Sequence, residues 1–345
     1  MKNKINNINF STIIFFISQQ SFLGIGLLKI LTLTRQNSIY VSFISSIFTL
    51  FILLFFLSYF NYLPNYNIKD KIKITYKKTN KIINLFILLF TILFFIYSLF
   101  LLSIYIQNKY LNETPKILII LLFLIPTVYS VNCGIKTISK TSFILFIISI
   151  LDYIFMFIGI TKYINFENFK PLFEVKYNNL LLSSINYSIY LCSSLFLICS
   201  VSKNDLEKPK SINKHIIIFI MLCNFFIFLL LFGIIGVFGI DLSLIFDFPG
   251  YILTKKINFF DFINHIENII SLVWLIGIFF NCVMSLYLIK IYIKSNRLYY
   301  LTILTCLLVS SLFFNNSNLL LVFIRKYYAL PFIVLFLIML KRNKN

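Results

Sequence analysis

The chain of 345 residues is 60% hydrophobic and only 12% charged, with a mean hydropathy of +0.92. Soluble domains carry about 25% charged residues, so this composition excludes an ordinary soluble fold and indicates a polytopic membrane protein. The net charge of +20 at pH 7 does not indicate nucleic-acid binding, because the basic residues lie in short loops between apolar segments, where membrane topology accounts for them.

Ten apolar segments are long enough to cross a bilayer, for which a helix needs about 20 residues. They are residues 9–33, 38–60, 82–106, 116–135, 141–161, 180–201, 213–237, 268–290, 298–315 and 319–340. We expect them to form a single all-α transmembrane domain over residues 1–345. The first segment lacks the small-residue cleavage site of a signal peptide, so it should stay in the membrane.

The first segment is polar in its middle, where Gln19, Gln20 and Ser21 are followed by Gly24 and Gly26. Glycine lets the backbone leave helical geometry at little steric cost. Backbone groups freed at that depth must be buried in protein or line a cavity, and interrupted helices of this kind form the substrate sites of secondary transporters. We therefore interpret the glycines as an unwound segment whose amide groups bind a ligand carboxylate, with the three polar side chains lining the site. Close packing of small residues between helices is the alternative.

About two thirds of the Lys and Arg residues fall in loops on the same side as the amino terminus, which predicts that both termini are cytoplasmic. Residues 238–267 form the longest outer loop. Its apolar residues recur on either side of Pro249 and Gly250, which predicts two short amphipathic helices on the outer face. Such a cap would gate the site or dock a partner.

Ten helices with both ends inside divide into two halves of five, here 9–161 and 180–340, which must have opposite orientations. This is the pattern of an inverted repeat, and it predicts that segment 180–201 is broken like the first. That segment is the most polar, with Ser184, Tyr187 and Tyr190 among its side chains. It has no glycine, and hydrogen bonding between packed helices is the alternative role for these residues.

Asp152 lies near the middle of segment 141–161. A charged carboxylate in lipid costs at least about 2.5 kcal/mol, so an intramembrane aspartate is a candidate proton or cation site. The alternative is a structural carboxyl that stays protonated or pairs with a polar neighbour. The six cysteines are scattered, and neither His215 nor His265 has a second ligand at metal spacing, so no metal site or cofactor is expected.

Two stretches carry a family resemblance. The first has a glutamine shortly before a Gly-x-Gly-Leu-Leu pattern, and the second has Phe-Pro, then Lys-Ile, then a glutamate and an aromatic residue. They consist of Gln20, Gly24, Gly26, Leu27 and Leu28, and of Phe248, Pro249, Lys256, Ile257, Glu267 and Trp274. Together they resemble the spore germination permease family, the polytopic B-type subunit of nutrient germinant receptors. That family is similar to the amino acid/polyamine/organocation transporters.

The resemblance implies a substrate site surrounded by the first, third, sixth and eighth of the ten predicted helices. These are segments 9–33, 82–106, 180–201 and 268–290. It therefore adds Tyr97 and Ser98 of segment 82–106, and Trp274 and Asn281 of segment 268–290, to the candidate lining residues. Core packing is the alternative for each of these four.

The resemblance also implies a germinant receptor subunit in the spore inner membrane, which binds a small nutrient such as an amino acid and works with A-type and C-type subunits. One alternative is a free-standing proton-coupled amino acid transporter, in which Asp152 would titrate. Another is a membrane enzyme acting on lipid-linked sugar. No loop gathers the acidic, histidine or arginine residues that such chemistry needs, so we expect no enzymatic activity.

Overall fold

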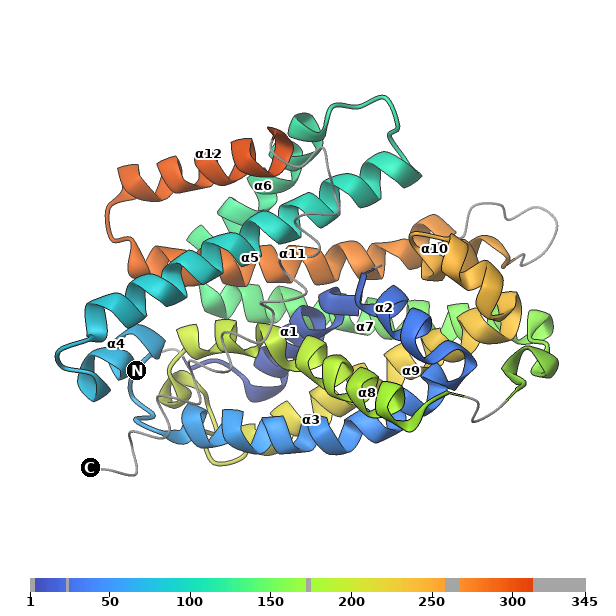
Figure 1. Ribbon diagram of the computed structural model, residues 1–345. Helices are drawn as coiled ribbons and strands as arrows, with labels where there is room; N and C mark the ends of the chain where they lie inside the picture. The colour runs from blue at the N-terminus through green and yellow to red at the C-terminus, as the bar shows by residue number, and fades with distance from the viewer. Residues whose placement is uncertain (1–3, 23–24, 172–174, 258–266, 313–345) are drawn as a thin grey trace.

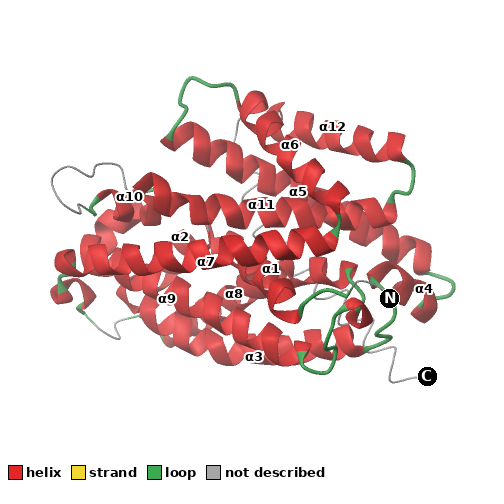
Figure 2. Cartoon of the chain, turned by 180° about the vertical axis from the view of Figure 1, so that it is seen from behind, coloured by secondary structure: helices red, strands yellow, loops and turns green. Residues whose placement is uncertain are grey.

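The computed structural model describes residues 4–22, 25–171, 175–257 and 267–312 as a bundle of helices (Figure 1). The described residues contain no β-strand, as Figure 2 shows, and only a single bridge between Ile5 and Leu206. The helices are α1 (Asn7–Gln19), α2 (Ile25–Thr34), α3 (Ser38–Asn61), α4 (Ile68–Thr75), α5 (Asn80–Lys109), α6 (Lys116–Cys133), α7 (Ile135–Ile160), α8 (Tyr177–Cys192), α9 (Ile212–Ile245), α10 (Pro249–Lys255), α11 (Glu267–Tyr292) and α12 (Asn296–Leu312).

Within the described part of the chain, seven helices are long and apolar enough to cross a membrane. Ten spans were predicted, and two features explain why fewer are found among the described residues. The first segment is divided into α1 and α2, each too short to cross alone, and α12 has only 17 residues. The tenth segment, 319–340, lies outside the described residues, as do most of the outer-loop residues after Ile257. The structure thus confirms an all-helical membrane protein.

The outer surface of the bundle is apolar along its length. Large side chains such as Phe51 and Leu54 of α3, Leu122 of α6 and Ile144 of α7 are more than half exposed. In a soluble protein such surfaces would be an aggregation hazard, whereas here they are the faces that contact lipid.

Helix α1 lies in the centre of the bundle, surrounded by α7, α9, α11 and the end of α8 (Figure 1). Every side chain from Phe10 to Gln20 is buried. Helix α1 therefore contacts other helices on all sides, and Gln19 and Gln20 are kept away from lipid.

The loops predicted to share a side of the membrane do meet at one end of the bundle. Asn7 donates to the carbonyl of Lys208 at 2.7 Å, and Lys290 donates to the Oδ1 atom of Asn132 at 2.8 Å. We call this end, with residues 4–7, 61–81, 132–140, 201–214 and 290–297, the basic end. Among the described residues, loops predicted to lie outside also contact one another, since Arg35 pairs with Asp241 and the backbone N–H of Asn165 donates to Gly236.

At the basic end, two lysines of α4 each contact the carboxyl end of a long helix. The Nζ atom of Lys71 donates to the carbonyls of Tyr59 and Phe60 at 3.3 and 3.1 Å, at the end of α3. The Nζ atom of Lys69 donates to the carbonyls of Ile291 and Tyr292 at 3.0 and 3.2 Å, at the end of α11. Cations stabilise the negative end of a helix dipole, so α4 joins the ends of α3 and α11.

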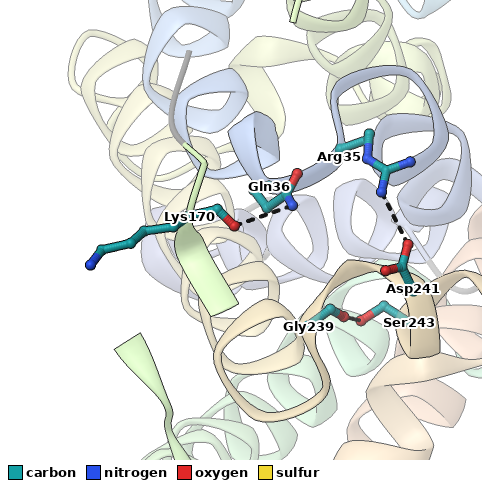
Figure 3. A network of polar contacts seen from close by, with 6 residues as sticks. All are labelled: Arg35, Gln36, Lys170, Gly239, Asp241 and Ser243. Atoms are coloured by element: carbon teal, nitrogen blue, oxygen red, sulfur yellow. Dashed lines mark hydrogen bonds and ion pairs between the residues drawn. The ribbon is translucent and has the colours of Figure 1, made fainter. Parts of the chain in front are cut away.

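At the opposite end, α9 is interrupted by Gly239, whose φ of +67° and ψ of −178° suit only glycine. The interruption leaves the carbonyl of Gly236 without its helical donor. The backbone N–H of Asn165 and the side-chain amide of Asn168 donate to it instead, at 2.9 and 2.8 Å. Arg35 reaches the same region and pairs with Asp241 at 3.0 Å (Figure 3).

The outer loop differs in detail from its prediction. Helical residues follow Gly239 as far as Ile245, and α10 starts at Pro249 itself, so Pro249 begins a helix instead of separating two. Proline is well suited to the first helical turn, where its missing N–H would have no partner anyway.

Candidate functional site

The first segment leaves α-helical geometry at Gln20. Helix α1 ends at Gln19, residues Gln20–Phe22 form a 3-10 helix that we call η1, and α2 begins at Ile25. A break was predicted here, but Gly26 lies within the first turn of α2 and is not part of an unwound stretch. Gly24 and the side chain of Ser21 lie outside the described residues. The break therefore begins at the glutamines, earlier than the glycines suggested.

The carbonyl of Ile17, in the last turn of α1, accepts hydrogen bonds from two other helices. The hydroxyl of Ser194 donates to it at 2.8 Å and the side-chain amide of Asn281 at 3.3 Å. Carbonyls in the last turn of a helix lack intrahelical donors, and in lipid such a group must find a partner within the protein. These two side chains stabilise the end of α1 at the centre of the bundle.

Two further contacts hold the break. The Nε2 atom of Gln20 donates to the hydroxyl of Ser98 in α5 at 2.9 Å. Helix α11 approaches so closely at Gly277 that a Cβ atom there would lie 3.3 Å from the carbonyl oxygen of Phe16. The break is therefore surrounded by α5, α11 and the end of α8, which together with α1 are the four helices expected from the resemblance.

Several buried oxygens at the break have no hydrogen-bond donor within the described part of the chain. They are the Oε1 atoms of Gln19 and Gln20, the Oδ1 atom of Asn281 and the hydroxyl of Ser18. Leaving a buried polar atom unpaired costs about 1–3 kcal/mol. Unpaired acceptors of this kind suit a ligand that donates hydrogen bonds, such as an ammonium group.

The sixth predicted segment is also divided. Helix α8 ends at Cys192, and residues Ser193–Ser200 continue as a 3-10 helix that we call η5. A break in this segment was predicted from the inverted repeat, and the change of helix type occurs without a glycine. Ser194, which contacts Ile17, is the second residue of η5. The two divided segments therefore meet at their points of division.

The tyrosines of α8 lie beside η1. The ring of Phe22 is 4.6 Å from that of Tyr187, whose hydroxyl donates to Asn224 in α9 at 2.5 Å. Tyr190 is 6.5 Å from Phe22, and the ammonium of Lys29 lies 5.8 Å from its ring. These residues form an aromatic wall next to the break. Ser184 instead donates to Leu180 within its own helix at 2.8 Å.

Tyr97 is buried beside Ser98 in α5, and Trp274 lies one turn before Gly277 on α11. Trp274 packs against α10, where a Cβ atom on Gly250 would come within 2.7 Å of its indole ring. Its ring is also 5.9 Å from that of Tyr105. Trp274 is seven residues before Asn281, or about 10 Å along the helix. It thus belongs to the contact between α10 and α11.

Asp152 is 8% exposed on α7, and its Oδ2 atom has no hydrogen-bond donor within the described residues. Helices α7 and α1 run side by side in the same direction, since Ser142 donates to the carbonyl of Asn9 at 3.0 Å and Phe146 lies 5.1 Å from Phe15. Continuing that register places Asp152 at about the depth of the break.

Two residues at the break, Ser194 and Gly277, were not among the predicted lining residues. Ser194 is one of many serines in its segment, so the sequence alone gave no reason to prefer it. Gly277 is the single glycine in segment 268–290, and an isolated glycine in an apolar helix is a signal of close helix approach.

Comparison with known families gives a match that covers most of the chain. The family model described as spore germination protein matches residues 7–319. The match includes α1, the break, η5 and α11, and so takes in every residue described at the site. No curated protein matches the sequence.

Proposed function

Because the chain belongs to the spore germination protein family, we propose that it is the membrane subunit of a nutrient germinant receptor. In this proposal it lies in the spore inner membrane, binds a small nutrient such as an amino acid at the break in the first segment, and acts with A-type and C-type subunits. Its complete fold is ten helices in two inverted halves of five.

The observation that supports this function most directly is the group of buried acceptor oxygens at the break. Gln19, Gln20 and Asn281 each present a side-chain oxygen that lacks a donor among the described residues. An α-ammonium group carries three N–H donors and would offer hydrogen bonds to oxygens of this kind. Binding of this kind can signal only if the ligand has different affinities for two conformations, and a site shared by separate helices allows that difference.

A free-standing proton-coupled amino acid transporter is the second candidate, and the buried carboxyl of Asp152 favours it. A carboxyl at the depth of the break could carry a proton through a transport cycle. In this case Asp152→Asn would abolish proton-coupled uptake of labelled amino acids into vesicles. A receptor without transport would show no uptake even in the wild type.

The receptor function can be tested with spores of the source organism that carry Gln20→Leu or Ser98→Ala. Each change removes one side of the hydrogen bond between η1 and α5. We expect at least a tenfold loss of the germination response to one or a few amino acids, with protein abundance unchanged on blots. Each tenfold corresponds to about 1.4 kcal/mol of binding free energy.

The matched control is Ser103→Ala. Ser103 is equally buried in α5, but its hydroxyl donates only to Phe100 of the same helix, at 2.8 Å. We expect its germination response to equal that of the wild type. If both break variants germinated normally on every amino acid at normal abundance, the nutrient would not bind at the break and the proposal would be wrong.

A further inference from the structure

A cavity of about 560 Å³ lies at the basic end, away from the break in the first segment. Helix α4, the first turns of α5 and the residues around the end of α11 surround it. Four lysines line it, Lys69, Lys73, Lys81 and Lys294, together with a single acidic residue, Asp70. Its walls are thus strongly positive, although they come from three separate parts of the chain.

Among the described residues that line this cavity, Asp70 is the single acidic side chain beside the four lysines. Lys69 uses two of its three N–H donors on the carbonyls of Ile291 and Tyr292. Burial lowers the pKa of Lys69 from its usual value, and the neighbouring charges of Lys294 and Lys73 lower it further, whereas Asp70 acts in the opposite direction. An anion in the cavity would relieve this repulsion between the lysines.

The start of α5 adds to the attraction for anions. Asn80, Lys81 and Asn84, from its first two turns, all line the cavity. The first N–H groups of a helix have no intrahelical acceptors, and Thr79 before them makes no capping bond with its side chain. A phosphate group fits this combination of lysines and a helix start, since both favour a compact anion with several acceptor oxygens.

The apolar part of the lining distinguishes a lipid from a small soluble anion. Leu85 and Leu88 line the cavity beyond Lys81, on the same face of α5. Leu85 is 55% exposed, and Ile82 and Leu89 beside it are also largely exposed, on the side of α5 that contacts lipid. The cavity therefore leads from a positive pocket onto an apolar helix surface, as a headgroup with attached acyl chains requires.

We propose that this cavity binds the phosphate headgroup of an anionic phospholipid, with its acyl chains along the exposed face of α5. Basic pockets between helices at the cytoplasmic side of a membrane are suited to such headgroups, and the distribution of basic loops predicts that the basic end is cytoplasmic. The lipid would contact Lys69 and thereby the end of α11, the helix that supplies Asn281 to the break.

The test uses the full-length protein in nanodiscs of phosphatidylcholine with increasing fractions of phosphatidylglycerol. Native mass spectrometry counts bound phosphatidylglycerol, and thermal unfolding measures the stabilisation. We expect saturable binding in the wild type and an affinity about thirtyfold lower in Lys73→Gln/Lys81→Gln, because each lysine near an anionic lipid contributes about 1 kcal/mol. Both lysines are exposed, so the double variant should still fold.

The matched control is Lys208→Gln/Lys210→Gln, which removes two exposed charges from another loop of the basic end. It should bind phosphatidylglycerol like the wild type. Equal loss of binding in both double variants would mean that only the overall surface charge matters, and would overturn the proposal. Inorganic phosphate provides the second arm, in discs of phosphatidylcholine alone. If phosphate stabilised the wild type as well as the lipid does, through the same lysines, the ligand would be a soluble anion and the lipid assignment would be wrong.

Discussion

At the scale of single residues, the break depends on the carbonyl oxygen of Ile17. This oxygen accepts hydrogen bonds from Ser194 of η5 and Asn281 of α11, and so connects both elements to α1. Interhelical hydrogen bonds in membrane proteins contribute about 0.6 kcal/mol on average. We expect Ser194→Ala or Asn281→Ala alone to lower the free energy of unfolding by roughly that amount. The double variant should cost more than the sum, because the carbonyl then loses both donors and an unpaired buried group costs about 1–3 kcal/mol.

Titration with a denaturing detergent in mixed micelles would measure these free energies. Ser103→Ala serves again as the control, since its hydroxyl bonds within its own helix. Strict additivity of the two single changes would show that the two donors do not share one acceptor in the folded protein.

Lys71 gives a second residue-scale prediction, on pH. Burial lowers its pKa to about 8 from the usual 10.5. Between these two values the unfolded chain holds a proton that the folded protein has released, so folding stability contributed by Lys71 rises with pH through this window. It is fully present above about 10.5 and is lost as the pH falls through about 8.

The comparison that isolates this effect is Lys71→Met, which keeps a long side chain but cannot titrate. We expect the stability advantage of the wild type over the variant, measured by thermal unfolding, to grow from pH 8 to pH 10.5. The neutral amine still has two N–H groups for the carbonyls of Tyr59 and Phe60. A constant or shrinking advantage over that range would contradict the prediction.

At the scale of elements, the interruption of α9 at Gly239 shows how one loop is fixed to one helix. We expect Gly239→Ala to destabilise the protein by about 1–3 kcal/mol, because its backbone angles are essentially limited to glycine. Steric overlap would add little, since the nearest atom to a new Cβ would be the Asn168 Oδ1 atom at 3.5 Å. Thermal unfolding of the purified protein measures the cost.

Asn168→Ala tests the contact between the loop and Gly236 separately from the backbone strain at Gly239. It removes the side-chain donor to the carbonyl of Gly236 but leaves the backbone N–H of Asn165 bonded there. We therefore expect a smaller loss, about 1 kcal/mol. If Gly239→Ala were neutral and Asn168→Ala were not, the loop contact would determine stability and backbone strain would not.

The elements also show what the sequence could and could not predict. Apolar length and flanking charge placed most ends of the described transmembrane helices within a few residues, because burial in lipid acts on every residue of a span. The exceptions are α7, which begins six residues before its predicted start at 141, and α9, which continues eight residues past its predicted end at 237. The start of the break was misplaced, because glycine marks where a backbone can bend and the bend itself depends on Ser98, Ser194 and Asn281. Those contacts join residues as much as 264 positions apart, and no local pattern in the sequence encodes them.

At the scale of the whole molecule, the grouping of basic loops predicts which end faces the cytoplasm. Cys133 is exposed at the basic end, and the other five cysteines are buried. A membrane-impermeant maleimide should therefore not label the wild type in intact cells and should label it after permeabilisation. Glu113→Cys, made together with Cys133→Ser, places a thiol in an exposed loop at the opposite end and should be labelled in intact cells. The reverse pattern would put the basic end outside.

The central position of α1 also constrains the order in which the protein is assembled. This helix is synthesised before α7, α9 and α11, which enclose it. Gln20 gains its partner Ser98 with α5, and the carbonyl of Ile17 gains Ser194 with η5, but that carbonyl lacks Asn281 until α11 has been made. The full set of bonds at the break can form only after α11 has entered the membrane, so a helix that is made early is among the last to reach its final structure. A nascent chain truncated before α11 would then lack a stable site, and quality control in the membrane would find its earliest segment still exposed.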